Sequence, residues 1–200
     1  MLVRTSQSNP DSRQVGQGEP PYYVKTLAMA LPAILLGIQI SGWIFFITPI
    51  RDGHPDFRAN YTSGVMAASG KLHQLYDYEA IKTVQDRIIS KEVVGMPFIH
   101  PAYEALAYVP FSFLKFRTAY CAFLILNLLL VFLCYRALRL ELQPAAVVWK
   151  PLPVVLGFTF LPVGAALMQG QDSILMLGCF VWSWTLMRRG KDFAAGFRGF

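Results

Sequence analysis

The amino-acid sequence predicts an all-α, polytopic membrane protein, and three observations support this fold class. Only 15% of the 200 residues are charged, whereas ordinary soluble domains carry about 25%. Hydrophobic residues make up 54% of the chain. Long uncharged runs alternate with short polar segments, and about 20 consecutive apolar residues are needed to span a bilayer as a helix.

The net charge of +6 fits the same fold class. Lys and Arg residues are scattered between the apolar runs and do not gather in one segment. Membrane proteins concentrate such residues in short cytoplasmic loops, whereas nucleic-acid-binding proteins gather them on one surface. We therefore expect no nucleic-acid partner.

Residues 1–25 are polar, are rich in Ser, Gln, Gly and Pro, and show no hydrophobic periodicity. This composition predicts a disordered tail, followed by a membrane domain over residues 26–200. Basic residues outnumber acidic ones in the tail, and Lys25 stands directly before the first apolar run. The positive-inside rule therefore predicts a cytoplasmic N-terminus, and we expect a multi-pass protein of the inner (plasma) membrane.

The first transmembrane helix is predicted over Leu27–Thr48, which contains no charged residue. An external loop over residues 50–100 follows, with two predicted helices that lie in the membrane interface. Asp56 is suited to be the N-cap of the first, which Gly70 would end in a left-handed conformation. Asp77 is suited to cap the second.

The rest of the chain contains four apolar runs, at Ala102–Leu114, Thr118–Tyr135, Leu152–Met168 and Ile174–Met187. The first is short and contains Pro110, so we expect it to lie in the interface or to re-enter, and not to cross. This count places both later basic segments, 136–150 and 188–191, in the cytoplasm. It also places Gln169–Ser173 on the same side as Asp56. A further helix is predicted to start within Ala194–Phe200.

Asp56 is the strongest candidate for a catalytic residue. A carboxylate just outside a membrane helix can act as a general base on an acceptor hydroxyl, although a plain N-cap is the simpler explanation of Asp56 taken alone. Arg58 and Lys71 follow it and could bind a substrate phosphate or contact lipid head groups instead. We include Tyr61, from the same polar stretch, among the candidate substrate-binding residues.

Two further polar groups are candidates for substrate binding. His100 and Glu104 stand at the start of an apolar run, where a carboxylate is costly unless it is paired or faces a cavity. Gln171 and Asp172 could hydrogen-bond sugar hydroxyls, although a simple loop would have the same composition. No cluster of oxygen ligands surrounds Asp56 in the sequence, so we expect no metal site and no cofactor.

Four segments in this order resemble glycosyltransferase family 87, which comprises membrane mannosyltransferase-like proteins of the GT-C fold. The segments are DFRANYTSGVMAASGKLHQLYDY, FIHPAYEALAYVPFSFL, MQGQDSILML and MRRGKDFAAGFRGF, and together they cover residues 50–200. The resemblance implies an integral membrane glycosyltransferase with a GT-C-like architecture. It also implies that Asp56 is the base that activates the acceptor.

The same resemblance implies the substrates. A hexosyl group, such as mannosyl, would pass from a polyprenyl-phosphate sugar to a lipid or glycan acceptor outside the cytoplasm, with inversion at the sugar carbon. The expected partners are thus the polyprenyl-phosphate donor, the acceptor and membrane lipids. No nucleotide sugar would be needed.

The chain departs from the family pattern in two ways. Ala102 follows Pro101 where the family has a second proline. The chain is also about half as long as family members, so we expect it to be the N-terminal half of a truncated enzyme. A missing C-terminal half would then be one of its partners. The alternative is a non-enzymatic or degenerate membrane protein, either a remnant or an accessory subunit.

Overall fold

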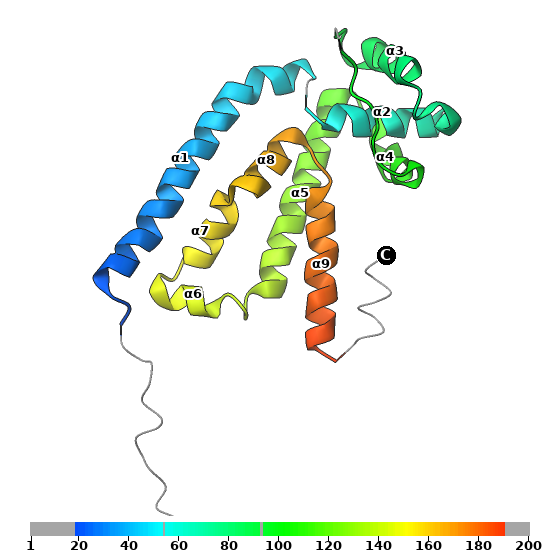
Figure 1. The fold of residues 1–200 in the computed structure, drawn as a ribbon. Helices are drawn as coiled ribbons and strands as arrows, with labels where there is room; N and C mark the ends of the chain where they lie inside the picture. Colours follow the sequence, from blue (N-terminus) through cyan, green and yellow to red (C-terminus); the bar gives the residue numbers. More distant parts are fainter. Residues whose placement is uncertain (1–18, 54, 93, 191–200) are drawn as a thin grey trace, which may run out of the picture.

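The computed structural model describes residues 19–53, 55–92 and 94–190 (Figure 1). Helices make up 76% of these residues, and no strand occurs among them, which confirms the all-α fold class. Most of the predicted tail, at residues 1–18, lies outside the described residues, as does the helix expected to start within Ala194–Phe200.

Two segments are long and apolar enough to cross a membrane. The first begins with α1 (Tyr22–Asp52), and the second is α5 (Phe116–Leu138). Helix α1 starts inside the predicted tail, earlier than expected. Pro32 is its only buried residue, as expected for a helix whose apolar side chains face lipid.

The third apolar run is broken into α7 (Leu152–Thr159) and α8 (Leu161–Gln169), which meet at an angle of 48°. Pro162 has no N–H to donate to the carbonyl of Phe158 within a continuous helix. Gln39 of α1 donates to that carbonyl instead, at 3.1 Å from Nε2 to O. If the bent pair counts as one span, three segments of the described chain can cross a membrane.

Helices α1, α7–α8, α5 and α9 (Ser173–Arg188) lie side by side in one layer (Figure 1). Helix α6 (Gln143–Val148) connects α5 to α7 at one end of this layer. The turn between α8 and α9 lies at the opposite end, where α1 also ends (Figure 1). This confirms that Gln169–Ser173 lies on the same side as Asp56.

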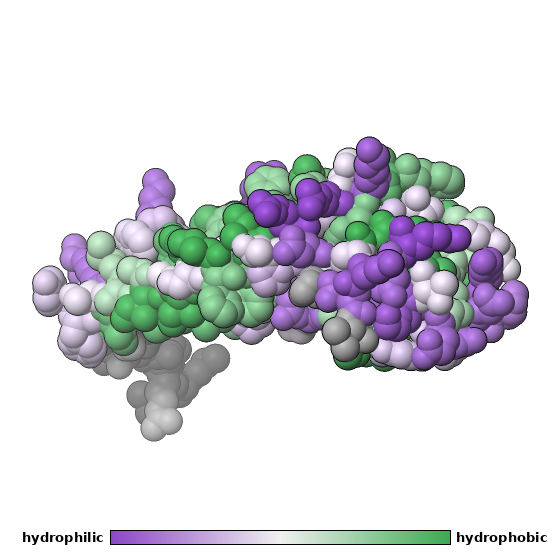
Figure 2. Space-filling view, turned by 90° about the horizontal axis from the view of Figure 1, so that it is seen from above, coloured by the Kyte–Doolittle hydropathy of each residue, from purple (hydrophilic) through white to green (hydrophobic). Residues whose placement is uncertain are grey.

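A helical head covers that end of the layer. It consists of α2 (Phe57–Ala68), η2 (Leu72–Gln74), α3 (Tyr78–Ile88), η3 (Ala102–Glu104) and α4 (Ala105–Ser112). The run Ala102–Leu114 thus packs in the head and does not cross the layer, as predicted. Seen from above, hydrophilic side chains gather over the head (Figure 2).

Local turn signals were predicted correctly in the head. Asp77 accepts hydrogen bonds from the backbone N–H groups of Glu79 and Ala80 and so caps α3. Gly70 adopts the left-handed conformation just after α2, with a φ of 70°. Helix α2 differs from the prediction, because most of its residues are buried and it is not an interfacial amphipathic helix.

Close packing between α2 and α4 explains this burial. A Cβ atom at Gly64 would lie 2.5 Å from the carbonyl oxygen of Tyr108, so only glycine allows the two helices to approach this closely. Phe57, at the start of α2, is fully buried. Its ring centroid lies within 6.5 Å of those of six aromatic residues of the head and α5, namely Tyr61, Tyr108, Phe111, Phe116, Tyr120 and Phe123. This cluster fixes the first turn of α2 and therefore the position of Asp56.

Candidate functional site

Two segments that are far apart in the sequence meet at the first turn of α2. Nε2 of Gln171 donates a hydrogen bond of 2.7 Å to Oδ2 of Asp56. Asp56 occupies the N-cap position of α2, but its side chain makes no capping hydrogen bond. The interpretation of Asp56 as a side-chain N-cap is therefore wrong, and its carboxylate is available for another role.

Gly170 allows this approach. It ends α8 in the left-handed conformation, with a φ of 66°, and a Cβ atom there would lie 2.7 Å from Cβ of Phe57. Tyr120 of α5 donates its hydroxyl to the carbonyl of Met168 at 2.6 Å. The last carbonyls of a helix lack partners within it, so this bond anchors the end of α8 and the Gln171 loop that follows.

The amide of Gln171 has a defined orientation. Its Nε2 also donates to Oε1 of Gln169 at 2.6 Å, and its Oε1 accepts from Oγ of Ser173 at 3.3 Å. The nitrogen must face Asp56, because an amide oxygen cannot donate to a carboxylate. Among the described residues, no hydrogen bond reaches Oδ1 of Asp56, so this oxygen is the one left to accept a proton.

A second polar cluster lies beside this pair. Nδ1 of His100 is 3.1 Å from Oε2 of Glu104 and 3.5 Å from Oδ2 of Asp172. All three residues are half-buried. The hydroxyl of Tyr76 donates to the backbone carbonyl of His100 at 2.8 Å, which fixes the loop before η3. The structure thus joins two groups that the sequence analysis treated separately.

Two of the cavities that these residues line share Asp172. The Asp56 cavity has a volume of about 410 Å³. Its polar lining residues are Asp56, Asn60, His100, Gln171, Asp172 and Ser173. The α9 cavity has a volume of about 730 Å³ and combines Glu104, Tyr108 and Asp172 with apolar residues of α9. Among the described residues, no Lys or Arg lines either cavity.

Tyr108 places an unpaired hydroxyl next to this site. The residue is 2% exposed, and its hydroxyl has no hydrogen-bond partner among the described residues. Burial raises the pKa of Tyr108 well above its usual value, and the charges of Asp172 and Glu104 raise it further. The group is therefore a neutral donor for whatever occupies the cavity.

Arg58 does not lie in the site. It is 1% exposed, and its guanidinium donates to the carbonyl of Gly53, to both oxygens of Ser90 and to Oε1 of Gln85. Burial lowers the pKa of Arg58, and the nearby carboxylates of Glu92 and Asp86 oppose that shift. These contacts hold α2, α3 and the end of α1 together, and they leave no support for the expectation that Arg58 binds a substrate phosphate.

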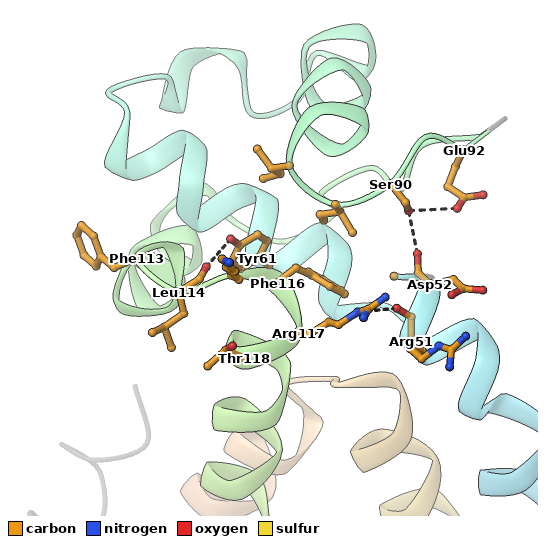
Figure 3. A pocket seen from close by; sticks show the side chains of 14 residues that line it. Arg51, Asp52, Tyr61, Ser90, Glu92, Phe113, Leu114, Phe116, Arg117 and Thr118 are labelled. Atoms are coloured by element: carbon orange, nitrogen blue, oxygen red, sulfur yellow. Dashed lines mark hydrogen bonds between the residues drawn. The ribbon is translucent and has the colours of Figure 1, made fainter.

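The two other expected substrate-binding residues also lie apart from Asp56. Lys71 is exposed on the head and lines neither cavity. Tyr61 donates its hydroxyl to the carbonyl of Leu114 at 2.7 Å and lines a separate cavity of about 1070 Å³ between the head and the ends of α1 and α5 (Figure 3). Arg51, Lys115 and Arg117 belong to that cavity.

Two residues of the site did not emerge from the sequence. Asn60 follows Asp56 by one helical turn, and Tyr108 follows Glu104 by the same spacing. Residues four apart share one face of a helix. Both residues could therefore have been found by looking one helical turn after each acidic candidate.

One comparison with known proteins gave a match. The family model described as glycosyltransferase family 87 matches residues 98–198, which include His100, Glu104, Gln171 and Asp172. Comparisons with curated proteins and with solved structures gave no match.

Proposed function

Because this chain belongs to glycosyltransferase family 87 and its helices identify it as a membrane protein, we propose that it transfers a hexosyl group, such as mannosyl, from a polyprenyl-phosphate sugar to a lipid or glycan hydroxyl, with Asp56 as the catalytic base. The observation that carries this proposal is the hydrogen bond between Gln171 and Asp56 at the edge of a cavity. It orients a carboxylate that no capping role explains.

Asp56 is the base, and Gln171 positions its carboxylate. Gln171 holds Oδ2, and Oδ1 then faces the acceptor hydroxyl and takes its proton. The acceptor oxygen attacks the anomeric carbon of the sugar as its O–H bond breaks. The bond from that carbon to the phosphate oxygen breaks in the same step, and the polyprenyl phosphate leaves with the electron pair. One direct displacement of this kind inverts the anomeric carbon.

The surroundings suit an amphipathic substrate. The side-chain amide of Asn60 and the remaining lone pair of Gln171 Oε1 can hydrogen-bond sugar hydroxyls in the Asp56 cavity. The adjoining α9 cavity is lined by Leu175, Met176 and Phe180, which suit the apolar chain of a polyprenyl donor. Asp172 lines both cavities, so a lipid chain in the α9 cavity would lie beside a sugar in the Asp56 cavity.

The charge distribution supports a site on the outer face of the plasma membrane. Arg136 and Arg139 lie at the end of α5, and Lys150 lies between α6 and α7. Arg188 and Arg189 lie at the end of α9. These positions are at the end of the helical layer opposite the head (Figure 1). The positive-inside rule assigns that end to the cytoplasm, and the head then faces outward.

The test is sugar transfer by membranes that contain the chain, with radiolabelled polyprenyl-phosphate mannose and added lipid acceptors. Asp56→Asn is expected to lower the rate by about 10²–10⁴-fold, the usual contribution of a general base. Asp52→Asn is the matched control, because Asp52 is close in sequence but lines the other cavity. Unchanged transfer by Asp56→Asn would remove Asp56 from the mechanism, and no transfer by the wild-type chain would favour a non-enzymatic role.

A further inference from the structure

We propose that His100, Glu104 and Asp172 bind a divalent metal ion, whose charge offsets that of the phosphate of the departing polyprenyl phosphate. The metal site was not expected from the sequence, because His100 and Asp172 are far apart along the chain. Its role in phosphate departure rests on the proposed function, whereas metal binding itself does not.

The distances fit ligands that share one ion. Metal–ligand bonds of about 2.0–2.2 Å place neighbouring ligand atoms about 3.0–3.6 Å apart. Nδ1 of His100 lies 3.1 Å from Oε2 of Glu104 and 3.5 Å from Oδ2 of Asp172, and one ligand atom from each residue lies within 4.8 Å of the others. Small side-chain movements would therefore complete three sites of a coordination shell.

The negative charge of the lining residues also favours a bound cation. Asp56, Glu104 and Asp172 line two adjoining cavities that contain no Lys or Arg from the described residues. A phosphate that leaves here would meet carboxylates in a partly buried environment, where repulsion between like charges is strong. The guanidinium of Arg58 is engaged elsewhere. A divalent ion held by this cluster would offset the negative charge.

Tyr108 provides an independent indication of a ligand. Its buried hydroxyl has no partner among the described residues, although buried polar groups are nearly always hydrogen-bonded. Tyr108 lies one turn after Glu104 and lines the same cavity as Glu104 and Asp172. A metal-bound water or a phosphate oxygen in this cavity would accept the hydrogen bond that the protein leaves unmade.

The ligand set selects the class of ion. Carboxylate oxygens suit Mg²⁺, Ca²⁺ and Mn²⁺, whereas imidazole favours first-row transition metals. One imidazole with two carboxylates therefore favours Mn²⁺ over Mg²⁺ and Ca²⁺. Zn²⁺ accepts the same donors, so both Mn²⁺ and Zn²⁺ are used as probes.

The direct test is Mn²⁺ binding to the purified 200-residue chain in detergent, measured by electron paramagnetic resonance, with a parallel Zn²⁺ titration by calorimetry. We expect one bound ion, and at least a ten-fold loss of affinity in the double variant Glu104→Gln, Asp172→Asn. Glu79→Gln, which removes a carboxylate on the exposed first turn of α3, is the matched control and should bind normally. Circular dichroism checks that all variants are folded.

Two results would overturn the proposal. One is a wild-type chain that binds neither ion at millimolar concentration, as expected if His100 only pairs with the two carboxylates. The other is unchanged binding by the double variant. A chain that binds Mn²⁺ through these residues but moves no sugar would refute the proposed function alone, whereas transfer at an undiminished rate in excess chelator would refute the metal's role alone.

Discussion

Gln171 donates a 2.7 Å hydrogen bond to Asp56 across 115 positions of the sequence. This bond links the loop between α8 and α9 to the first turn of α2, and it leaves one oxygen of the carboxylate free of protein donors among the described residues. An amide that holds one oxygen of a carboxylate fixes the direction in which the other can accept a proton. The orientation of the Asp56 carboxylate therefore depends on the loop between α8 and α9.

Replacement of Gln171 by alanine is expected to lower the rate of sugar transfer by about 10- to 100-fold, because a hydrogen bond to a charged group contributes about 1.5–3 kcal/mol. Gln171→Glu should lower it further, since it places a second carboxylate against Asp56. Gln143→Ala, on the exposed start of α6 at the other end of the layer, is the control. Initial rates at saturating donor give the comparison, and equal rates for Gln171→Ala and wild type would refute the positioning role.

Gly170→Ala is expected to separate Asp56 from Gln171. The new Cβ would lie 2.7 Å from Cβ of Phe57, in addition to the strain of a positive φ. Gly70→Ala is the matched control, because Gly70 also has a positive φ but has open space around it. We expect Gly170→Ala to be less stable than Gly70→Ala by about 1–3 kcal/mol, the usual cost of overpacking. Thermal unfolding in detergent measures the difference, and equal stability of the two would contradict the close approach.

Features of the fold that depend on local sequence could be predicted. Apolar runs indicated the membrane helices, and the left-handed Gly70 and the Asp77 cap followed from neighbouring residues alone. The bend between α7 and α8 was missed although Pro162 was visible. A proline does not reveal whether a neighbouring side chain will satisfy the freed carbonyl, as Gln39 does here.

The site was only partly predictable because its geometry depends on tertiary contacts. Asp56, His100 and Gln171 were expected as candidates from their residue types and their places beside apolar runs. Nothing in the sequence could show that Asp56 and Gln171 share a hydrogen bond. The buried partners of Arg58 could not be foreseen for the same reason, because a basic residue next to a candidate base resembles a phosphate ligand in the sequence.

Arg58 is expected to act through stability and not through substrate affinity. Arg58→Ala leaves the carbonyl of Gly53 without its buried donor and leaves Oε1 of Gln85 with the N–H of Met96 as its only donor, and an unsatisfied buried acceptor costs about 1–3 kcal/mol. Arg87→Ala, which removes an exposed arginine of α3, should have little effect. Chemical denaturation in mixed micelles compares the variants, and a stable Arg58→Ala with a raised KM for the donor would restore the phosphate-binding interpretation.

Asp86 makes the stability of the head depend on pH. The hydrogen bond from Nζ of Lys82, at 2.6 Å, lowers the pKa of Asp86 most, the backbone N–H of Glu92 and the charge of Arg58 lower it further, and burial opposes these effects. A carboxyl with a lower pKa in the folded state stabilises that state above its unfolded-state pKa of about 3.9. This contribution is lost as the pH falls through the folded-state value.

The pH dependence can be isolated with Asp86→Asn. At pH 7 this variant should unfold at a lower temperature than the wild-type chain, and the gap should narrow as the pH falls below about 4. The reason is that protonation of Asp86 in the wild-type chain removes the same charged contact that the variant lacks. Glu79→Gln, which removes an exposed carboxylate from the same helix, is the matched control and should unfold at nearly the wild-type temperature at pH 7. Melting curves between pH 7 and pH 3 test the expectation, which a constant gap for Asp86→Asn would contradict.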